Sequence, residues 1–172
     1  NAHYTDLPHL LRRRKDMDLA AEMQWSLLPP LSFESAGVSL SGLLEPAYEV
    51  GGDCFDYAFN NGTLDFAVVD AMGHGLASSV LASLLIGAYR HGRRAGQTLA
   101  QLTTSIDEAA RTLPGPGTFA TVLLARLETD TGSMSWISSG HPPPLIVRDG
   151  SVLPEIEFSP GLPLGLGGLG AV

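Results

Sequence analysis

The period of the hydrophobic pattern changes twice along this chain, and that change most constrains the fold. Before Gly75 the apolar residues occur in short segments separated by turn residues, which is typical of strands. Between residues 76 and 113 they recur every three or four positions, which is typical of helices. Strand-like segments return from Phe119 onward. The order strands, two helices, strands predicts an α+β protein with a mainly antiparallel sheet, because βαβ units would alternate helices with strands.

Turn and breaker residues place the expected elements. Asn60-Asn61-Gly62 predicts a hairpin, since these residues adopt the positive φ angles of a tight turn. Pro29-Pro30 should end an N-terminal helix, because proline has no amide donor and clashes with the preceding turn. Asp149-Gly150 predicts a second hairpin turn. We expect strands at 38–46, 54–59, 64–69, 119–127, 133–138 and 145–147, helices at 9–28, 76–92 and 99–113, and a loop from Gly161 onward.

Each of the two central helices has one apolar face, so each should cover a face of the sheet. The face of the first helix comprises Leu76, Val80, Leu81, Leu84, Leu85 and Ala88. The face of the second comprises Leu99, Leu102, Ile106, Ala110 and Leu113.

Composition excludes several classes of protein. The 172 residues, 44% hydrophobic and 16% charged, suit one folded domain with a core. A formal charge of −8 disfavours nucleic acid as a partner, because phosphate binding needs clustered Lys and Arg. The single cysteine, Cys54, cannot form an internal disulfide, so we expect a cytoplasmic setting and an inert thiol. No apolar run approaches the roughly 20 residues of a membrane span, so membrane insertion is not expected.

Two acidic motifs flanked by glycine lie in the strand-rich first half. Gly51-Gly52-Asp53-Cys54-Phe55-Asp56 is the first, and Val68-Val69-Asp70-Ala71-Met72-Gly73-His74-Gly75 is the second. Each presents a carboxylate at the edge of a predicted strand, as in sites for hard, oxygen-seeking cations. Aspartate beside glycine is also common in turns and helix caps, so the local sequence leaves both interpretations open.

Two further segments extend this pattern. Ala21-Glu22-Met23-Gln24-Trp25-Ser26-Leu27-Leu28-Pro29 precedes the acidic motifs, and Ser139-Gly140-His141-Pro142-Pro143-Pro144 follows them. In this order, and with Thr118-Phe119-Ala120-Thr121, the segments resemble the metal-dependent serine/threonine protein phosphatases of type 2C, in the bacterial SpoIIE and RsbU branch. The resemblance implies a β-sandwich flanked by helices, with two Mn²⁺ or Mg²⁺ ions at one end of the sheets.

The resemblance also implies roles for the acidic residues. Asp70 would bridge both ions, Asp53 would be a further ligand directly or through water, and Ala71 would offer its carbonyl oxygen. Asp56 would act outside the direct ligands, although an exposed strand carboxylate is an equal alternative. Two cations can deprotonate a shared water, direct it at phosphorus and neutralise the phosphoryl oxygens.

The glycines of the second motif have one interpretation, and each of the two histidines has two. Gly73 and Gly75 would let backbone and substrate approach closely. His74 would either donate a proton to the leaving seryl or threonyl oxygen or only hydrogen-bond within its turn. His141 precedes three prolines that hold the chain extended, so we favour a structural role for it over substrate contact.

The chain departs from the family pattern at its end. The resemblance calls for two more aspartates downstream, whereas Glu155 and Glu157 are the only acids after Asp149. We therefore expect a phosphatase domain at 31–172 whose last strands are missing. Residues 1–30 should form a linker or docking helix, to which an upstream sensor domain or a second copy of the chain would couple.

The predicted function is metal-dependent dephosphorylation of phosphoserine or phosphothreonine on a regulatory protein. By resemblance, that protein is an anti-sigma-factor antagonist in bacterial partner switching. The alternative is a catalytically weak or inactive phosphatase fold that only binds a partner, which the missing aspartates favour. A remote alternative is a diguanylate cyclase, because Gly51-Gly52-Asp53 resembles the start of the Gly-Gly-Asp-Glu-Phe hairpin, but Cys54 replaces its acidic residue.

Overall fold

The computed structural model describes residues 25–35, 37–45, 51–113, 118–153, 159 and 161–166. Its strands are β1 (Ser32–Ser35), β2 (Val38–Ser41), β3 (Gly51–Asn60), β4 (Thr63–His74), β5 (Ala120–Glu128), β6 (Ser133–Ser139), β7 (Val147–Arg148) and β8 (Ser151–Val152), and its helices are α3 (Leu76–Arg94) and α4 (Leu99–Ala110). The predicted α+β order is confirmed.

The N-terminal helix predicted at 9–28 lies largely outside the described residues. Residues 25–27 are helical, and the helix has ended before Pro29-Pro30, as predicted. No helix in the described ranges combines the length and apolar character needed to cross a membrane.

A four-stranded antiparallel sheet in the order β3-β4-β5-β6 forms the centre of the molecule. The hairpin between β3 and β4 turns at Asn61 and Gly62, whose φ angles are 49° and 80°. These angles confirm the predicted turn, because a two-residue hairpin requires positive φ at both central positions. β4 continues to His74, so Asp70 lies inside the strand and not at its end as predicted, since β5 pairs with β4 as far as Ala71.

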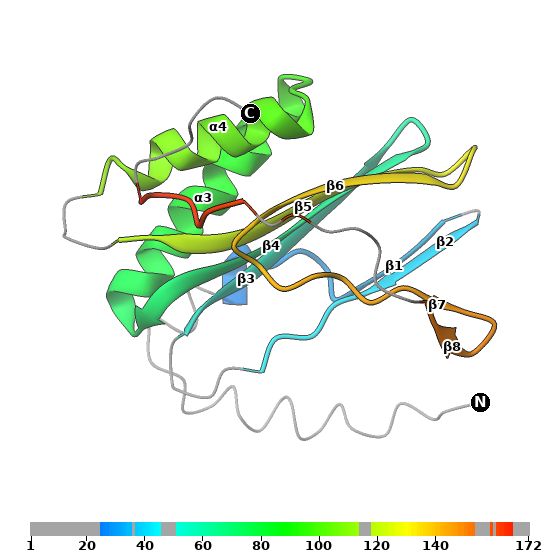
Figure 1. The fold of residues 1–172 in the computed structure, drawn as a ribbon, viewed down its shortest axis with the longest axis horizontal. Coiled ribbons are helices and arrows are strands. Elements are labelled where there is room, and N and C mark those ends of the chain that lie inside the picture. The colour runs from blue at the N-terminus through cyan, green and yellow to red at the C-terminus, as the bar shows by residue number, and fades with distance from the viewer. Residues whose placement is uncertain are drawn as a thin grey trace.

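Both long helices cover the same face of this sheet (Figure 1), where α3 packs on β3 and β4 and α4 packs on α3, β5 and β6. The capping box of α4, in which Thr98 and Gln101 bond each other's backbone, fixes where that helix begins. The core between helices and sheet comprises Cys54, Ala67, Val69, Ala71, Leu81, Ala82, Leu85, Ile86, Tyr89, Leu102, Ile106, Ala110, Ala120, Val122, Leu124 and Leu164.

The predicted apolar face of α3 is partly wrong. Leu81 and Leu85 are buried, but Leu76 and Val80 are 63% and 46% exposed. Ser78 and Ser79 are buried in their place, and their hydroxyls donate to the backbone carbonyls of Gly75 and Leu76. These bonds satisfy the serine hydroxyls at the start of the helix, so α3 can turn its polar residues inward there.

The β1–β2 hairpin lies on the sheet face opposite the helices (Figure 1). The Phe33 ring packs against Tyr57 and Phe59 of β3, with ring centroids 5.8 Å and 5.5 Å apart. β2 is shorter than the strand predicted at 38–46, because its partner β1 begins only at Ser32. Within the described residues, the β1–β2 hairpin is therefore a second β-layer against the main sheet, in the place that the predicted sandwich gives its second sheet.

One prediction for the C-terminal part is wrong. The strand expected at 145–147 does not extend the sheet; among the described residues β7 pairs only with β8, through the predicted Asp149-Gly150 turn. Prolines 142–144 explain this, because they have no amide hydrogens for a sheet ladder. Residues 161–166 form no helix or strand, as predicted, but they contribute to the core, since Leu164 is fully buried and exchanges two backbone hydrogen bonds with Ala120.

Candidate functional site

Asp53 and Asp70 stand directly opposite each other on β3 and β4. Val69 and Ala71 point into the core under the helices, so Asp70 between them points to the other face of the sheet. Its direct partner Asp53 shares that face. Both aspartates are exposed. The turn and helix-cap interpretations are wrong for both, because each lies within a strand and Gly75 occupies the N-cap of α3.

The two carboxylates repel each other. Partial burial raises the pKa of Asp53 above its usual value, and the charge and hydrogen bonding of Asp70 raise it further. The positive charge that His141 can carry acts in the opposite direction. A pair of neighbouring carboxylates with this raised pKa disfavours two negative charges, so a cation bound between them would be favoured.

Thr121, on the neighbouring strand β5, extends the pair of Asp53 and Asp70 into a row of three residues across the sheet. It is the cross-strand partner of Asp70 on β5, and it shares the face of Asp70 because its neighbours Ala120 and Val122 are in the core. Its Oγ1 lies 2.8 Å from Nδ1 of His141. Three adjacent strands thus place Asp53, Asp70 and Thr121 in one line across the sheet, with His141 beside its end.

His141 is partly buried, and burial lowers the pKa of its imidazole. The negative charges of Asp70 and Asp53 act in the opposite direction. Through Thr121, the structure therefore brings His141 beside the carboxylates, although it follows Asp70 by 71 residues and Asp53 by 88 in the sequence.

The segment that presents His141 is held at several points. Gly140 has a φ of 71°, and a Cβ at this position would collide with the ring of Pro163. Its amide donates to the carbonyl of Gly161 over 2.8 Å, and the Ser138 hydroxyl donates to the carbonyl of His141, also over 2.8 Å. Glycine is required at 140 both for its conformation and for space.

Gly73, His74 and Gly75 form the link from β4 to α3. Gly73 and Gly75 have φ angles of 89° and 83°, which explains glycine at both positions. His74 is exposed and pairs with Gly51 at the end of the β3–β4 ladder. It therefore lies on the same hairpin as the two aspartates, on the side where the chain enters α3.

Gly52 determines how closely the two strands approach beside the aspartates. A Cβ added to Gly52 would collide with the carbonyl oxygen of Ala71. The β3–β4 register also shifts between Gly51 and Asp53, which marks a bulge. Glycine therefore leaves the Ala71 carbonyl uncovered by a side chain next to the Asp53–Asp70 pair.

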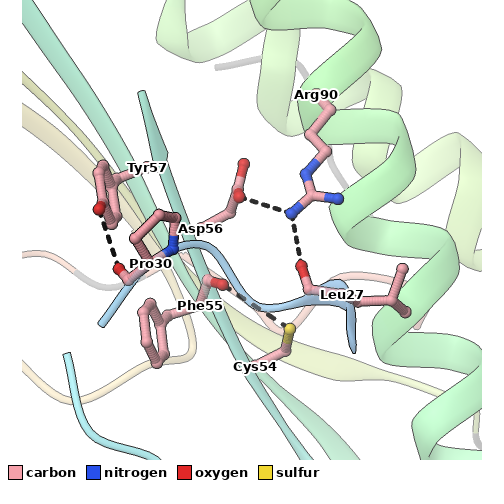
Figure 2. Close-up of polar contacts among 7 residues, drawn as sticks. All are labelled: Leu27, Pro30, Cys54, Phe55, Asp56, Tyr57 and Arg90. Atoms are coloured by element: carbon pink, nitrogen blue, oxygen red, sulfur yellow. Dashed lines mark hydrogen bonds and ion pairs between the residues drawn. The ribbon is translucent and has the colours of Figure 1, made fainter. Parts of the chain in front are cut away.

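Asp56 lies apart from this row, which corrects the expectation that it is exposed or acts beside the metal ligands. It is 3% exposed and faces α3, on the opposite side of the sheet from Asp53. Arg90 Nη2 donates to Asp56 Oδ1 over 2.7 Å and to the carbonyl of Leu27 over 2.6 Å (Figure 2). On the other face of β3, the Tyr57 hydroxyl donates to the carbonyl of Pro30 over 2.9 Å. These contacts fasten residues 27–30 to the edge strand.

Cys54 is a core residue, buried more deeply than expected of an inert surface or half-buried thiol. It is buried beneath the helices, and burial raises the pKa of its thiol to about 11. The thiol is therefore protonated at neutral pH and is not a nucleophile.

The donor set fits a hard divalent cation in kind, since carboxylate and carbonyl oxygens are the ligands that Mg²⁺ and Mn²⁺ prefer. Among the described residues, however, no group of three or more His, Cys, Asp or Glu side chains gathers as a metal site would require. The described part of the chain thus supplies two carboxylates and the neighbouring Ala71 carbonyl.

Sequence reasoning missed Thr121, which joins the row, and Arg90, which binds Asp56 on the opposite face of the sheet. Thr121 joins the row through the register of β5 on β4, and Arg90 reaches Asp56 from α3. Neither residue lies in a distinctive local pattern. The one available signal was Thr118-Phe119-Ala120-Thr121, which resembled a family strand but did not show which residue faces Asp70.

Comparison with known proteins finds a matching family model and a related protein. The family model of Stage II sporulation protein E (SpoIIE) matches residues 60–171. Phosphoserine phosphatase RsbU of Bacillus subtilis (strain 168) is 19% identical over 130 residues, which cover 76% of this chain and 39% of RsbU.

Two solved structures share the fold. The SiaA-PP2C domain of Pseudomonas aeruginosa matches with a TM-score of 0.59 and 21% identity, over 76% of this chain and 55% of that one. The RsbU and RsbW domains of Rv1364c from Mycobacterium tuberculosis match with a TM-score of 0.61 and 30% identity, over 72% of this chain and 34% of that one. The chain thus spans about a third to just over half of the length of these relatives.

Proposed function

Because the chain belongs to the SpoIIE family, we propose that it is part of a metal-dependent phosphatase that hydrolyses phosphoserine or phosphothreonine on a regulatory protein. The relative named as a phosphoserine phosphatase supports this reaction. The relative in which RsbU and RsbW domains occur together supports a partner-switching protein of the anti-sigma-factor antagonist type as substrate. The upstream sensor, the dimer and the cytoplasmic location stay predictions, as does the division at residue 30.

The observation that carries the proposal is the cross-strand pair of Asp53 and Asp70 on an open face of the sheet. We assign both carboxylates, with the Ala71 carbonyl, to Mn²⁺ or Mg²⁺. When bound, such ions lower the pKa of a coordinated water and neutralise charge on the phosphoryl oxygens. The chain itself supplies the acidic row that attracts the cation and the rigid strands that hold the two carboxylates at a fixed separation.

We assign a role at the leaving group of the reaction to residues 73–75, which link β4 to α3. His74 is exposed on the hairpin that carries both aspartates, and we propose that it donates a proton to the seryl or threonyl oxygen. Gly73 and Gly75 have open space where a side chain would project, so a phosphorylated segment can approach the backbone there.

Release of phosphate from a phosphoserine peptide in the presence of Mn²⁺ tests the proposal. Asp70→Asn should lower the rate by at least about 100-fold, because the site loses a charge that binds the cation. Asp130→Asn, the same change in the exposed β5–β6 turn, is the matched control and should leave the rate unchanged. Equal rates for wild type and Asp70→Asn would rule out this site. Capture of a phosphorylated partner without Mn²⁺ uptake or turnover would instead support the binding-module alternative.

A further inference from the structure

The contact between Thr121 and His141 has no task in the hydrolysis assigned above. Thr121 Oγ1 and His141 Nδ1 are 2.8 Å apart, which is a full hydrogen bond. The bond occupies one of the two ring nitrogens and leaves Nε2 as the atom through which the ring can act. Thr121 is also the direct neighbour of Asp70 across the sheet, so this bond ties the imidazole to the carboxylate row.

The backbone on either side of His141 is itself held in place by several contacts. The Ser138 hydroxyl binds its carbonyl, the Gly140 amide binds Gly161, and Pro163 packs against Gly140 where a side chain would otherwise be. Three prolines follow and restrict the chain further. If His141 served only to end β6, its side chain would not need the hydrogen bond with Thr121.

We propose that Thr121 is a positioning residue whose hydroxyl donates a hydrogen bond to Nδ1 of His141. The ring then carries its proton on Nε2 and donates a hydrogen bond from there to a phosphoryl oxygen held at the Asp53–Asp70 row. This inference rests on the proposed function, because the phosphoryl group is that of the substrate. It assigns His141 to substrate contact, in place of the structural role favoured from the sequence.

Electrostatics selects this tautomer over the other. The ring lies beside the carboxylates, because it is bonded to Thr121, the cross-strand partner of Asp70. A phosphoryl oxygen attracts a proton on Nε2 and repels a lone pair there, because that oxygen carries negative charge. A threonine hydroxyl can adapt, since its hydrogen rotates to donate to Nδ1.

The tautomer is measured first, by long-range nitrogen–proton NMR of the metal-free protein labelled with ¹⁵N-histidine. The His141→Gln variant assigns the signals of residue 141. Wild type and Thr121→Ser should show a proton on Nε2 and an acceptor at Nδ1, because both keep the hydroxyl. Thr121→Val has a similar shape but no hydroxyl, and the fixed tautomer should be lost. A wild-type proton on Nδ1 would overturn the inference, and so would a Thr121→Val spectrum like that of wild type.

Binding of inorganic phosphate in the presence of Mg²⁺, measured by calorimetry, is the second readout. Thr121→Val and His141→Gln should each bind phosphate about tenfold or more weakly than wild type, while Thr121→Ser stays within about twofold. Unchanged affinity in Thr121→Val and His141→Gln would overturn the donor role, as would a wild type that binds no phosphate or a Thr121→Ser variant as weak as Thr121→Val. If the tautomer and phosphate results hold but no phosphopeptide is hydrolysed, the proposed function fails and the placement of His141 stands.

Discussion

Two glycines, Gly52 and Gly87, should respond to alanine in opposite directions. At Gly52 a Cβ collides with the Ala71 carbonyl oxygen, so Gly52→Ala should lower the free energy of unfolding by about 1–3 kcal/mol through overpacking. Gly87 lies in the middle of α3 with nothing within 4 Å of an added Cβ, so Gly87→Ala should raise it by about 0.5–1 kcal/mol. Urea unfolding measures both changes. A neutral Gly52→Ala would show that the strands have room to separate there.

Cys54 should make stability depend on alkaline pH. Burial raises the pKa of its thiol from 9.0 to about 11 in the folded state, so the protonated thiol favours folding. This contribution is complete below about pH 9 and is lost as the pH rises through 11, at up to about 1.4 kcal/mol per pH unit. The free energy of unfolding measured from pH 8 to 11 should fall less steeply in Cys54→Ala. Parallel slopes for the two proteins would contradict the burial of the thiol.

At the scale of elements, two arginines of similar geometry make a matched pair. Arg90 joins Asp56 of β3 to the Leu27 carbonyl, and Arg126 joins Asp65 of β4 to the Gln97 carbonyl, with both Arg–Asp distances at 2.7 Å. Replacing either arginine by methionine leaves a buried carboxylate unpaired and should cost about 3–5 kcal/mol.

Only the Arg90 contact should affect the candidate site. Among the described strands β3 lies at the edge of the sheet and pairs with β4 alone, and Asp53 lies on it three residues before Asp56. Arg90→Met should therefore speed amide hydrogen exchange at 51–56 and weaken Mn²⁺ binding, whereas Arg126→Met should do neither at equal destabilisation. The Asp56→Leu/Arg90→Met double variant should recover much of the stability, since it removes the unpaired charge. Equal effects of Arg90→Met and Arg126→Met on Mn²⁺ binding would contradict a specific link to β3.

At the scale of the whole molecule, Mn²⁺ should stabilise the fold if it binds only the native arrangement of Asp53 and Asp70. At 100 times its dissociation constant the gain in the free energy of unfolding is about 2.7 kcal/mol. Asp53→Asn should abolish this gain and yet raise stability without metal, because it removes a charge that partial burial and the repulsion from Asp70 both disfavour, as the raised pKa of Asp53 indicates. Thermal unfolding with Mn²⁺ and with a chelator measures both effects. A metal response that survives in Asp53→Asn would place the ion elsewhere.

Local sequence determined the order of the elements, the Asn61-Gly62 turn and the end of the first helix before Pro29-Pro30. These features depend on backbone preferences that act over a few residues. The four motifs also sufficed for the family, because their order and spacing along the chain are properties of the sequence itself. The apolar face of α4 was predictable for the same reason, since Leu102, Ile106 and Ala110 repeat at the helical period.

Only the tertiary structure decided which residues meet. The register of three strands aligns Asp53, Asp70 and Thr121. Backbone bridges from Gly161 to Ser139 and from Leu164 to Ala120 hold the chain next to the segment that carries His141. Asp53 and Asp56 have the same local chemistry, but the pleat sends one to the open face and the other to Arg90. Strand register and helix rotation arise from packing between distant segments, which a local pattern does not encode.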